Sequence, residues 1–195
     1  MPPVTQALLI ANVAVYLLGG AGMVPLDDLA LWPPGGFESR FAPWQLVTYA
    51  FLHASLSHIF FNMLGLYMFG AEVERLFGSR FYAAYYFGSV LSAGLCHLVV
   101  TGWMGGSPQP MVGASGGVYG LLLAFGFYFP HRRVLLLFPP IPMPARVFVI
   151  VFAVLELGFG VTGTQAGVAH LAHLGGMLGG WLMIQYRRGG FPFRR

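Results

Sequence analysis

The chain carries too few charged side chains to cover a folded body in water. Asp, Glu, Lys and Arg together make up 8% of its 195 residues, whereas a soluble globular protein carries roughly 25%. Hydrophobic residues account for 57% of the chain, and its mean hydropathy is +0.72. This composition excludes a soluble enzyme and a disordered chain, and it predicts a protein that folds in a lipid bilayer.

The positive charge of the chain does not indicate nucleic-acid binding. The formal net charge is +4 and the isoelectric point is about 9.5. The basic residues nevertheless form no run that could follow a phosphate backbone. We therefore expect the lipid bilayer, and no nucleic acid, as the surroundings of this chain.

The apolar residues fall into segments of about the length that crosses a membrane. A transmembrane helix needs about 20 mostly apolar residues, with a range of roughly 17 to 25. Six stretches reach or approach this length, namely residues 7–24, 58–77, 81–100, 114–129, 145–161 and 168–186. The prediction is an all-α membrane protein in which residues 1–195 form one polytopic domain, a compact bundle of six transmembrane helices.

A long external loop is predicted between the first and second helices. Its second half, residues 44–56, is apolar but too short to span, so we expect it in the membrane interface or as a re-entrant segment. No Lys or Arg precedes Arg40, so we interpret the first helix as retained and not as a cleaved signal peptide.

The placement of the arginines predicts the orientation of the bundle. With six helices, nine of the ten arginines lie in the tail and loops of one side, and Arg40 alone lies on the other. The positive-inside rule makes the arginine-rich side cytoplasmic. We therefore expect a multi-pass protein of the cell membrane, such as a bacterial inner membrane, with both termini in the cytoplasm.

Polar side chains recur near the external ends of three predicted helices. His58 and Asn62 begin the second helix, Ser115 begins the fourth, and His170 and His173 begin the sixth. These three helices all enter from outside, so their first turns share one depth, with His173 about 7 to 8 Å below the surface. An unpaired polar group in a bilayer costs several kcal/mol, so the shared depth indicates a functional site.

These residue types suit a serine hydrolase. The hydroxyl of Ser115 becomes a nucleophile when a base removes its proton, and the imidazole of His173 is the usual kind of base. The oxyanion that forms needs fixed donors, which His58, Asn62 and the Ser115 backbone N–H could supply. The expected catalytic pair is therefore Ser115 and His173.

Small residues indicate how the fourth and sixth helices could meet. They recur at four-residue spacing: Gly116, Gly120 and Ala124 on the fourth helix, and Gly176 and Gly180 on the sixth. Such spacing lets two helices approach closely, which would bring Ser115 near His173. Tyr119, one turn after Ser115, could hold the imidazole by stacking.

Three short segments, taken together and in order, carry a family resemblance. They are HIFFN at 58–62, GASG from Gly113 to Gly116, and AHLGGMLGG at 172–180. The sequence resembles the rhomboid intramembrane serine proteases, of the bacterial type with a six-helix core, over roughly residues 44–180. His53, Glu74 and Tyr119 also fall where that family has such residues.

The resemblance implies an activity and a substrate class. It implies an endopeptidase without a cofactor that uses a Ser115–His173 dyad to cut transmembrane segments of membrane-anchored proteins near the external face. Gln45 is a departure, because many members have arginine after the loop tryptophan. That loop is expected to contact lipid, so the departure concerns how the loop is anchored.

Other interpretations of the same residues were weighed. A non-catalytic polytopic scaffold or a transporter is the alternative function, although no inverted repeat is present. His170 and His173, with His53 and His58, could bind a metal, but no HExxH pattern accompanies them, so we expect none. The sequence defines no oligomeric state.

The acidic residues were assigned by depth. Glu156 alone lies close to His173 in depth, and because the resemblance implies a dyad, we expect it to be a neutral or gate-side group. Glu72 and Glu74 are expected to pair with Arg75 and Arg80 at the cytoplasmic end of the second helix. His170 and His97 are expected to be structural or interfacial histidines.

Overall fold

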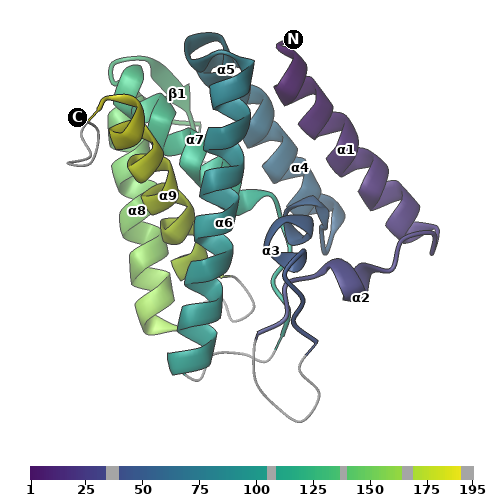
Figure 1. Ribbon diagram of the computed structural model, residues 1–195. Helices are drawn as coiled ribbons and strands as arrows, with labels where there is room; N and C mark the ends of the chain where they lie inside the picture. Colours follow the sequence, from purple (N-terminus) through teal and green to yellow (C-terminus); the bar gives the residue numbers. More distant parts are fainter. Residues whose placement is uncertain (34–39, 105–108, 137–139, 164–168, 190–195) are drawn as a thin grey trace.

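Helices make up most of the protein in the computed structural model, which describes residues 1–33, 40–104, 109–136, 140–163 and 169–189. Calls that include residues 34–39, 105–108, 137–139, 164–168 or 190–195 lie outside this description at those positions. Figure 1 shows long helices side by side, joined by short helical and extended segments.

The elements follow one another in a simple order. Long helices are α1 (Pro3–Gly20), α6 (Ser79–Met104), α7 (Ser115–Tyr128), α8 (Ala145–Thr162) and α9 (His170–Arg187). Between α1 and α6 lie α2 (Leu26–Leu29), α3 (Gln45–Thr48), the 3₁₀ turn η1 (Tyr49–Phe51), and then α4 (Leu56–Gly65), the π-helical turn η2 (Leu66–Gly70) and α5 (Ala71–Phe77). Strands β1 (Arg133–Leu135) and β2 (Pro142–Pro144) form an antiparallel hairpin in the proline-rich stretch.

Length and composition support a membrane protein. Among the described residues, three helices are long and apolar enough to cross a bilayer: Pro3–Gly20, Ser79–Gly102 and Ala145–Thr162. Helix α7, Ser115–Tyr128, is apolar but shorter. The count of six membrane spans therefore stays a prediction, although the six predicted stretches all coincide with helical segments in the described parts of the chain.

The predicted bounds of the first helix, 7–24, are wrong by four residues at each end. The helix begins at Pro3, whose fixed φ suits the first helical position. It ends at Gly20 because Gly22 adopts φ of 72°, and the Met23 N–H donates to the Leu18 carbonyl 2.9 Å away. The helical run predicted to begin at residue 58 starts at Leu56, since the Ser55 side chain accepts from the His58 N–H.

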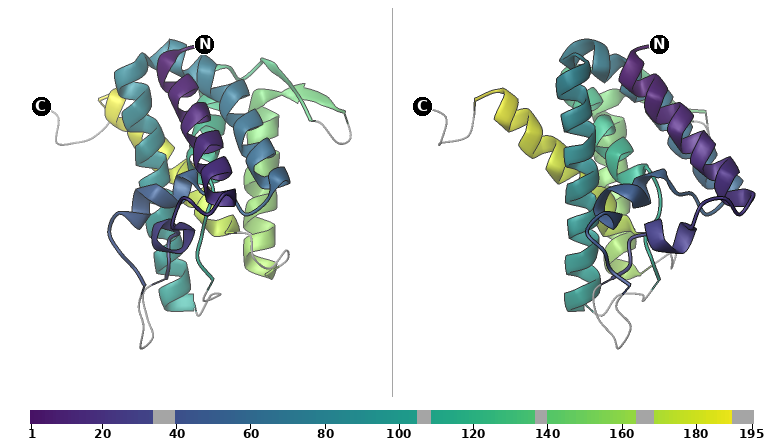
Figure 2. Two further views of the ribbon diagram at one scale, coloured as in Figure 1. Left: turned by 90° about the vertical axis from the view of Figure 1, so that its right-hand side faces the viewer. Right: turned by 45° about the vertical axis from the view of Figure 1, so that its right-hand side comes forward.

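The described arginines gather at one end of the bundle, with Arg40 as the exception. The start of α1, the α5–α6 turn, the β hairpin and the end of α9 lie at the same end in Figures 1 and 2. Glu72 binds both Arg75 and Arg132, each at 2.9 Å. The arrangement matches the clustering expected from the sequence.

The expected pairing of Glu74 with arginine is wrong. Glu74 is buried and accepts from the N–H groups of Val4 and Thr5 at 3.0 and 2.7 Å, and from the Thr5 and Ser79 hydroxyls at 2.7 Å. The first N–H groups of a helix lack partners within that helix and carry partial positive charge, so they attract a carboxylate. Glu74 therefore ties the start of α1 to the rest of the bundle.

Gln45 anchors the loop that follows α1. Its side-chain oxygen accepts from the N–H groups of Trp32 and Ala42, and its amide donates to the carbonyls of Asp28 and Arg40, at 2.9 to 3.2 Å. The side chain is buried, so these four bonds satisfy a group that would otherwise be costly. The amide thus anchors the loop where many relatives have arginine.

The loop also holds the segment that leads into α7. Leu31 and Met111 exchange two backbone hydrogen bonds of 3.0 and 2.9 Å, and the Gly113 N–H donates to the Tyr49 carbonyl at 3.0 Å. Ser115 follows two residues later at the start of α7. Residues far apart in the sequence therefore fix the entry to this helix.

Helices α7 and α9 pack with their backbones in direct contact. A Cβ built on Gly176 would overlap the carbonyl oxygen of Gly116 and lie 2.9 Å from its carbonyl carbon. One turn further along, a Cβ on Gly180 would lie 3.3 Å from the Gly120 α-carbon. The close approach expected from the glycine spacing is present.

We expect Gly176→Ala to destabilise the protein by about 1–3 kcal/mol, the usual cost of overpacking. The added methyl group meets backbone, which cannot rotate away as a side chain can. Thermal unfolding in detergent measures this change. Gly158→Ala is the matched control, because Gly158 lies in α8 with open space around its Cβ position. Equal melting temperatures for both variants and the wild type would contradict this account of the α7–α9 contact.

Candidate active site

Ser115 and His173 meet at the contact between α7 and α9. The Nε2 atom of His173 lies 2.8 Å from the Ser115 hydroxyl oxygen, within hydrogen-bond distance. Ser115 is the first residue of α7, where backbone N–H groups lack partners within the helix. The arrangement brings together a hydroxyl, an imidazole and a helix N-terminus.

Tyr119 and Gly113 shape the surroundings of this pair. The rings of Tyr119 and His173 stack with centroids 4.4 Å apart and an interplanar angle of 7°. Gly113 adopts φ of 127°, and a Cβ there would lie 2.7 Å from the His58 Nε2 atom and 3.6 Å from the Ser115 hydroxyl. Only glycine fits this position, because a side chain would be strained and would displace His58.

His58 and Asn62 face the same cavity as Ser115 and His173. The cavity measures about 910 Å³, and all four residues line it. The His58 Nδ1 atom accepts from the Ala54 N–H at 3.3 Å, so in the neutral ring the proton lies on Nε2. The Asn62 amide donates one hydrogen to the His58 carbonyl at 2.9 Å and has a second one to donate.

His53 packs against His58 outside the predicted spans. The two rings meet edge to face with centroids 5.0 Å apart. Burial, together with the neighbouring His58, lowers the pKa of His53 to about 4. His53 is therefore neutral at physiological pH, and it supports the ring of His58 without adding charge beside it.

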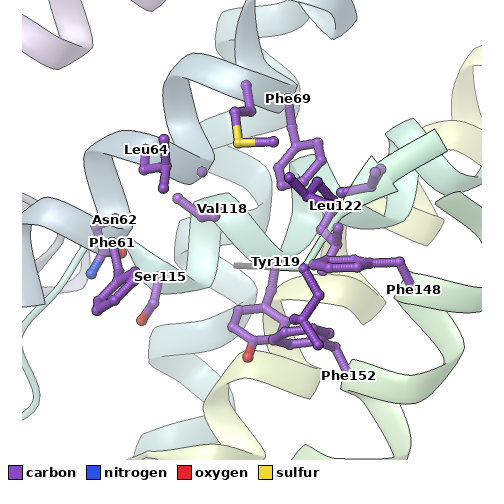
Figure 3. A pocket seen from close by; sticks show the side chains of 15 residues that line it. Phe61, Asn62, Leu64, Phe69, Ser115, Val118, Tyr119, Leu122, Phe148 and Phe152 are labelled. Carbon is purple, nitrogen blue, oxygen red and sulfur yellow. The ribbon is translucent and has the colours of Figure 1, made fainter. Parts of the chain in front are cut away.

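A second, apolar cavity opens beside Ser115. It measures about 440 Å³ and lies between α4, α7, α8 and the β hairpin. Figure 3 shows Phe61 and Asn62 next to Ser115, with Phe148 and Phe152 at the other side. Its lining is almost entirely apolar, so it suits a hydrophobic side chain placed next to the serine.

Comparison with known proteins matches this geometry to one family. The rhomboid domain matches residues 40–189, well over half of the chain. The chain belongs to the rhomboid family.

Named relatives are consistent with this assignment. The chain is similar to the rhomboid protease GluP of Bacillus subtilis, with 30% identity over 71% of this chain and 25% of that protein. It is 32% identical to the mitochondrial RHOMBOID-like protein 12 of Arabidopsis thaliana, over 76% of this chain and 48% of that protein. It is also 32% identical to the rhomboid protease GlpG of Klebsiella pneumoniae, over 62% of this chain and 41% of that protein. The chain thus spans half or less of the length of these three relatives.

Glu156 of this rhomboid protein is not where the sequence analysis expected it. Its carboxylate oxygen Oε2 lies 2.9 Å from the His173 Nδ1 atom and 2.7 Å from the His170 Nδ1 atom. The Tyr119 hydroxyl donates to the other oxygen, Oε1. Interpretation as a gate-side group was wrong, because α8 packs beside α9 and directs this carboxylate to the back of the His173 ring.

The same cluster was tested as a metal site. Among the described residues, Glu156, His170 and His173 bring three possible ligand atoms within 4.8 Å of one another. Ligands bound tetrahedrally to zinc at 2.0–2.1 Å lie roughly 3.3 Å apart. The observed oxygen–nitrogen distances of 2.7 and 2.9 Å are instead hydrogen-bond lengths. The geometry fits direct hydrogen bonds better than a shared ion.

We expect Gly113→Ala to slow labelling of Ser115 by a fluorophosphonate probe by about tenfold or more, since it displaces a predicted oxyanion donor, His58. Gly78→Ala is the matched control, because Gly78 adopts φ of 75° with open space around it. Both variants carry backbone strain of about 1–3 kcal/mol, but only Gly113→Ala moves His58. Equal labelling rates in the two variants would show that strain, and not the clash, is responsible.

Proposed function

We propose that this rhomboid protein is a serine-type intramembrane endopeptidase that cleaves transmembrane segments of membrane-anchored proteins. The observation that carries the proposal is the 2.8 Å contact between Ser115 and His173 at a cavity that also holds His58 and Asn62. Rhomboid membership and the named rhomboid proteases among its relatives support it.

In this proposal Ser115 is the nucleophile and His173 the general base. His173 takes the hydroxyl proton on Nε2 as the Ser115 oxygen attacks the peptide carbonyl. The protonated ring then gives that proton to the leaving amine, which frees the C-terminal product and leaves an acyl-enzyme. Water, activated by the same imidazole, hydrolyses this ester and restores the serine.

Three donors are proposed to stabilise the tetrahedral oxyanion. They are the Ser115 backbone N–H, the His58 Nε2–H and the second amide hydrogen of Asn62. The Ala54 contact to His58 Nδ1 leaves the Nε2–H available, and the positive end of the α7 dipole adds to the effect. Fixed donors of this kind cost no reorganisation when the charge develops.

The apolar cavity of about 440 Å³ supports the proposed substrate class. An apolar side chain of an unwound membrane segment would fit there beside Ser115. We also propose six membrane spans, an active site near the external face and cytoplasmic termini in a cell membrane, because the described arginines other than Arg40 lie at the opposite end from the start of α7. A scaffold or transporter is less favoured, since neither role needs a serine aligned with an imidazole.

We expect Ser115→Ala and His173→Ala each to abolish cleavage of a model transmembrane substrate in purified protein. Residues that act as one unit lose nearly everything on single substitution, so the double variant should be no worse. Melting temperatures should stay close to that of the wild type. Turnover near the wild-type rate in either single variant would eliminate the proposed pair.

Substituting an oxyanion donor should be severe but not complete. His58→Ala and Asn62→Ala should each lower kcat by about 10² to 10³ and leave KM nearly unchanged. Slow fluorophosphonate labelling of Ser115 should survive, because the serine and its base remain.

Asn12→Ala is the matched control for Asn62→Ala. Asn12 is buried in α1 and donates to the Leu8 carbonyl at 2.8 Å, the same bond to the fourth preceding residue that Asn62 makes. It does not line the cavity that holds Ser115. If Asn12→Ala and Asn62→Ala lower kcat equally, Asn62 has only a packing role.

A further inference from the structure

A buried carboxylate lies behind the proposed base, in a helix that is otherwise apolar. Glu156 is the acidic residue of α8, and only 7% of it is exposed. Its two oxygens accept hydrogen bonds from three side chains, those of Tyr119, His170 and His173. These partners come from α7 and α9, so the carboxylate joins three helices.

The contact with Glu156 selects one tautomer of His173. An ionised carboxylate only accepts hydrogen bonds, so the ring presents Nδ1–H to Oε2 at 2.9 Å. The proton of the neutral ring is then on Nδ1, and the Nε2 lone pair faces the Ser115 hydroxyl at 2.8 Å. Only this tautomer can take the serine proton; the other one would point a donor at Ser115.

The carboxylate is itself held in place. The Nδ1–H of His170 binds the same oxygen at 2.7 Å, and the His170 ring contacts Phe159 with centroids 5.4 Å apart. Tyr119 binds Oε1 through its hydroxyl and stacks on His173 through its ring. One tyrosine thus fixes both the imidazole and the acid that orients it.

We propose that Glu156 is a positioning residue that completes a Ser115–His173–Glu156 triad, an inference that rests on the proposed function. The carboxylate orients the imidazole, holds its proton on Nδ1 and stabilises the positive charge that the ring acquires during attack. The other titratable groups that face His173 are Tyr119 from α7, His170 from α9 and His58 from α4. None of these supplies a fixed negative charge.

Glu156→Gln tests the triad while keeping the shape of the side chain. The amide either turns its NH₂ toward His173 and reverses the tautomer, or keeps its oxygen there and loses the charge. Both outcomes lower kcat, by at least about 10²-fold and toward the roughly 10⁴-fold loss that such a change causes in soluble triads. KM should stay within roughly threefold, because the substrate does not contact this residue.

Glu74→Gln is the matched control. It also replaces a buried carboxylate that accepts several hydrogen bonds, but at the opposite end of the bundle. It should lower the melting temperature and leave kcat unchanged. The triad is overturned if Glu156→Gln keeps kcat within about threefold of wild type, or if both variants lose kcat equally. EDTA should leave the wild-type rate unchanged; a changed rate would assign the cluster to a metal instead.

A measurement that needs no activity separates this inference from the proposed function. In protein labelled with ¹⁵N-histidine, the His173 signals, identified by their loss in His173→Ala, should show the proton on Nδ1. A wild-type His173 protonated on Nε2 alone would overturn the positioning role. If wild-type protein neither cleaves nor labels, the proposed function fails, and this spectrum still decides the contact with Glu156.

Discussion

The contact between Gly116 and Gly176 is the constraint on which the rest of the site depends. These residues let the backbones of α7 and α9 meet with no side chain between them. Because Ser115 precedes Gly116 and His173 lies one turn before Gly176, the same contact brings the hydroxyl and the imidazole to 2.8 Å. In a bilayer, where apolar surface gives little driving force for helix association, close packing of small residues is the available means.

A second constraint is that each buried polar group needs a partner. Glu74 caps the start of α1, Gln45 joins four backbone groups of the loop, and Glu156 accepts from three side chains. An apolar environment strengthens such bonds and makes their loss costly. The polar residues of this chain therefore fix geometry at three separate places, of which one is the proposed active site.

The sequence was sufficient for the features that depend on periodicity and composition. Charge depletion predicted a membrane protein, glycine spacing predicted the α7–α9 contact, and the shared depth of Ser115 and His173 predicted that they meet. Helix ends were less predictable, because the start of α1 depends on Pro3 and on Glu74, a residue about 70 positions away. The partner of Glu156 was missed for a similar reason: depth placed it near His173, but only the packing of α8 beside α9 shows which way it points.

The central claim is that Ser115 is a nucleophile activated by His173 in the folded protein. The most direct test is to treat the purified wild-type protein with a fluorophosphonate and to locate the adduct by mass spectrometry of its peptides. The account predicts one modified residue, Ser115, and no modification of it in His173→Ala. An adduct on another serine, or equal modification of Ser115 in both proteins, would contradict it.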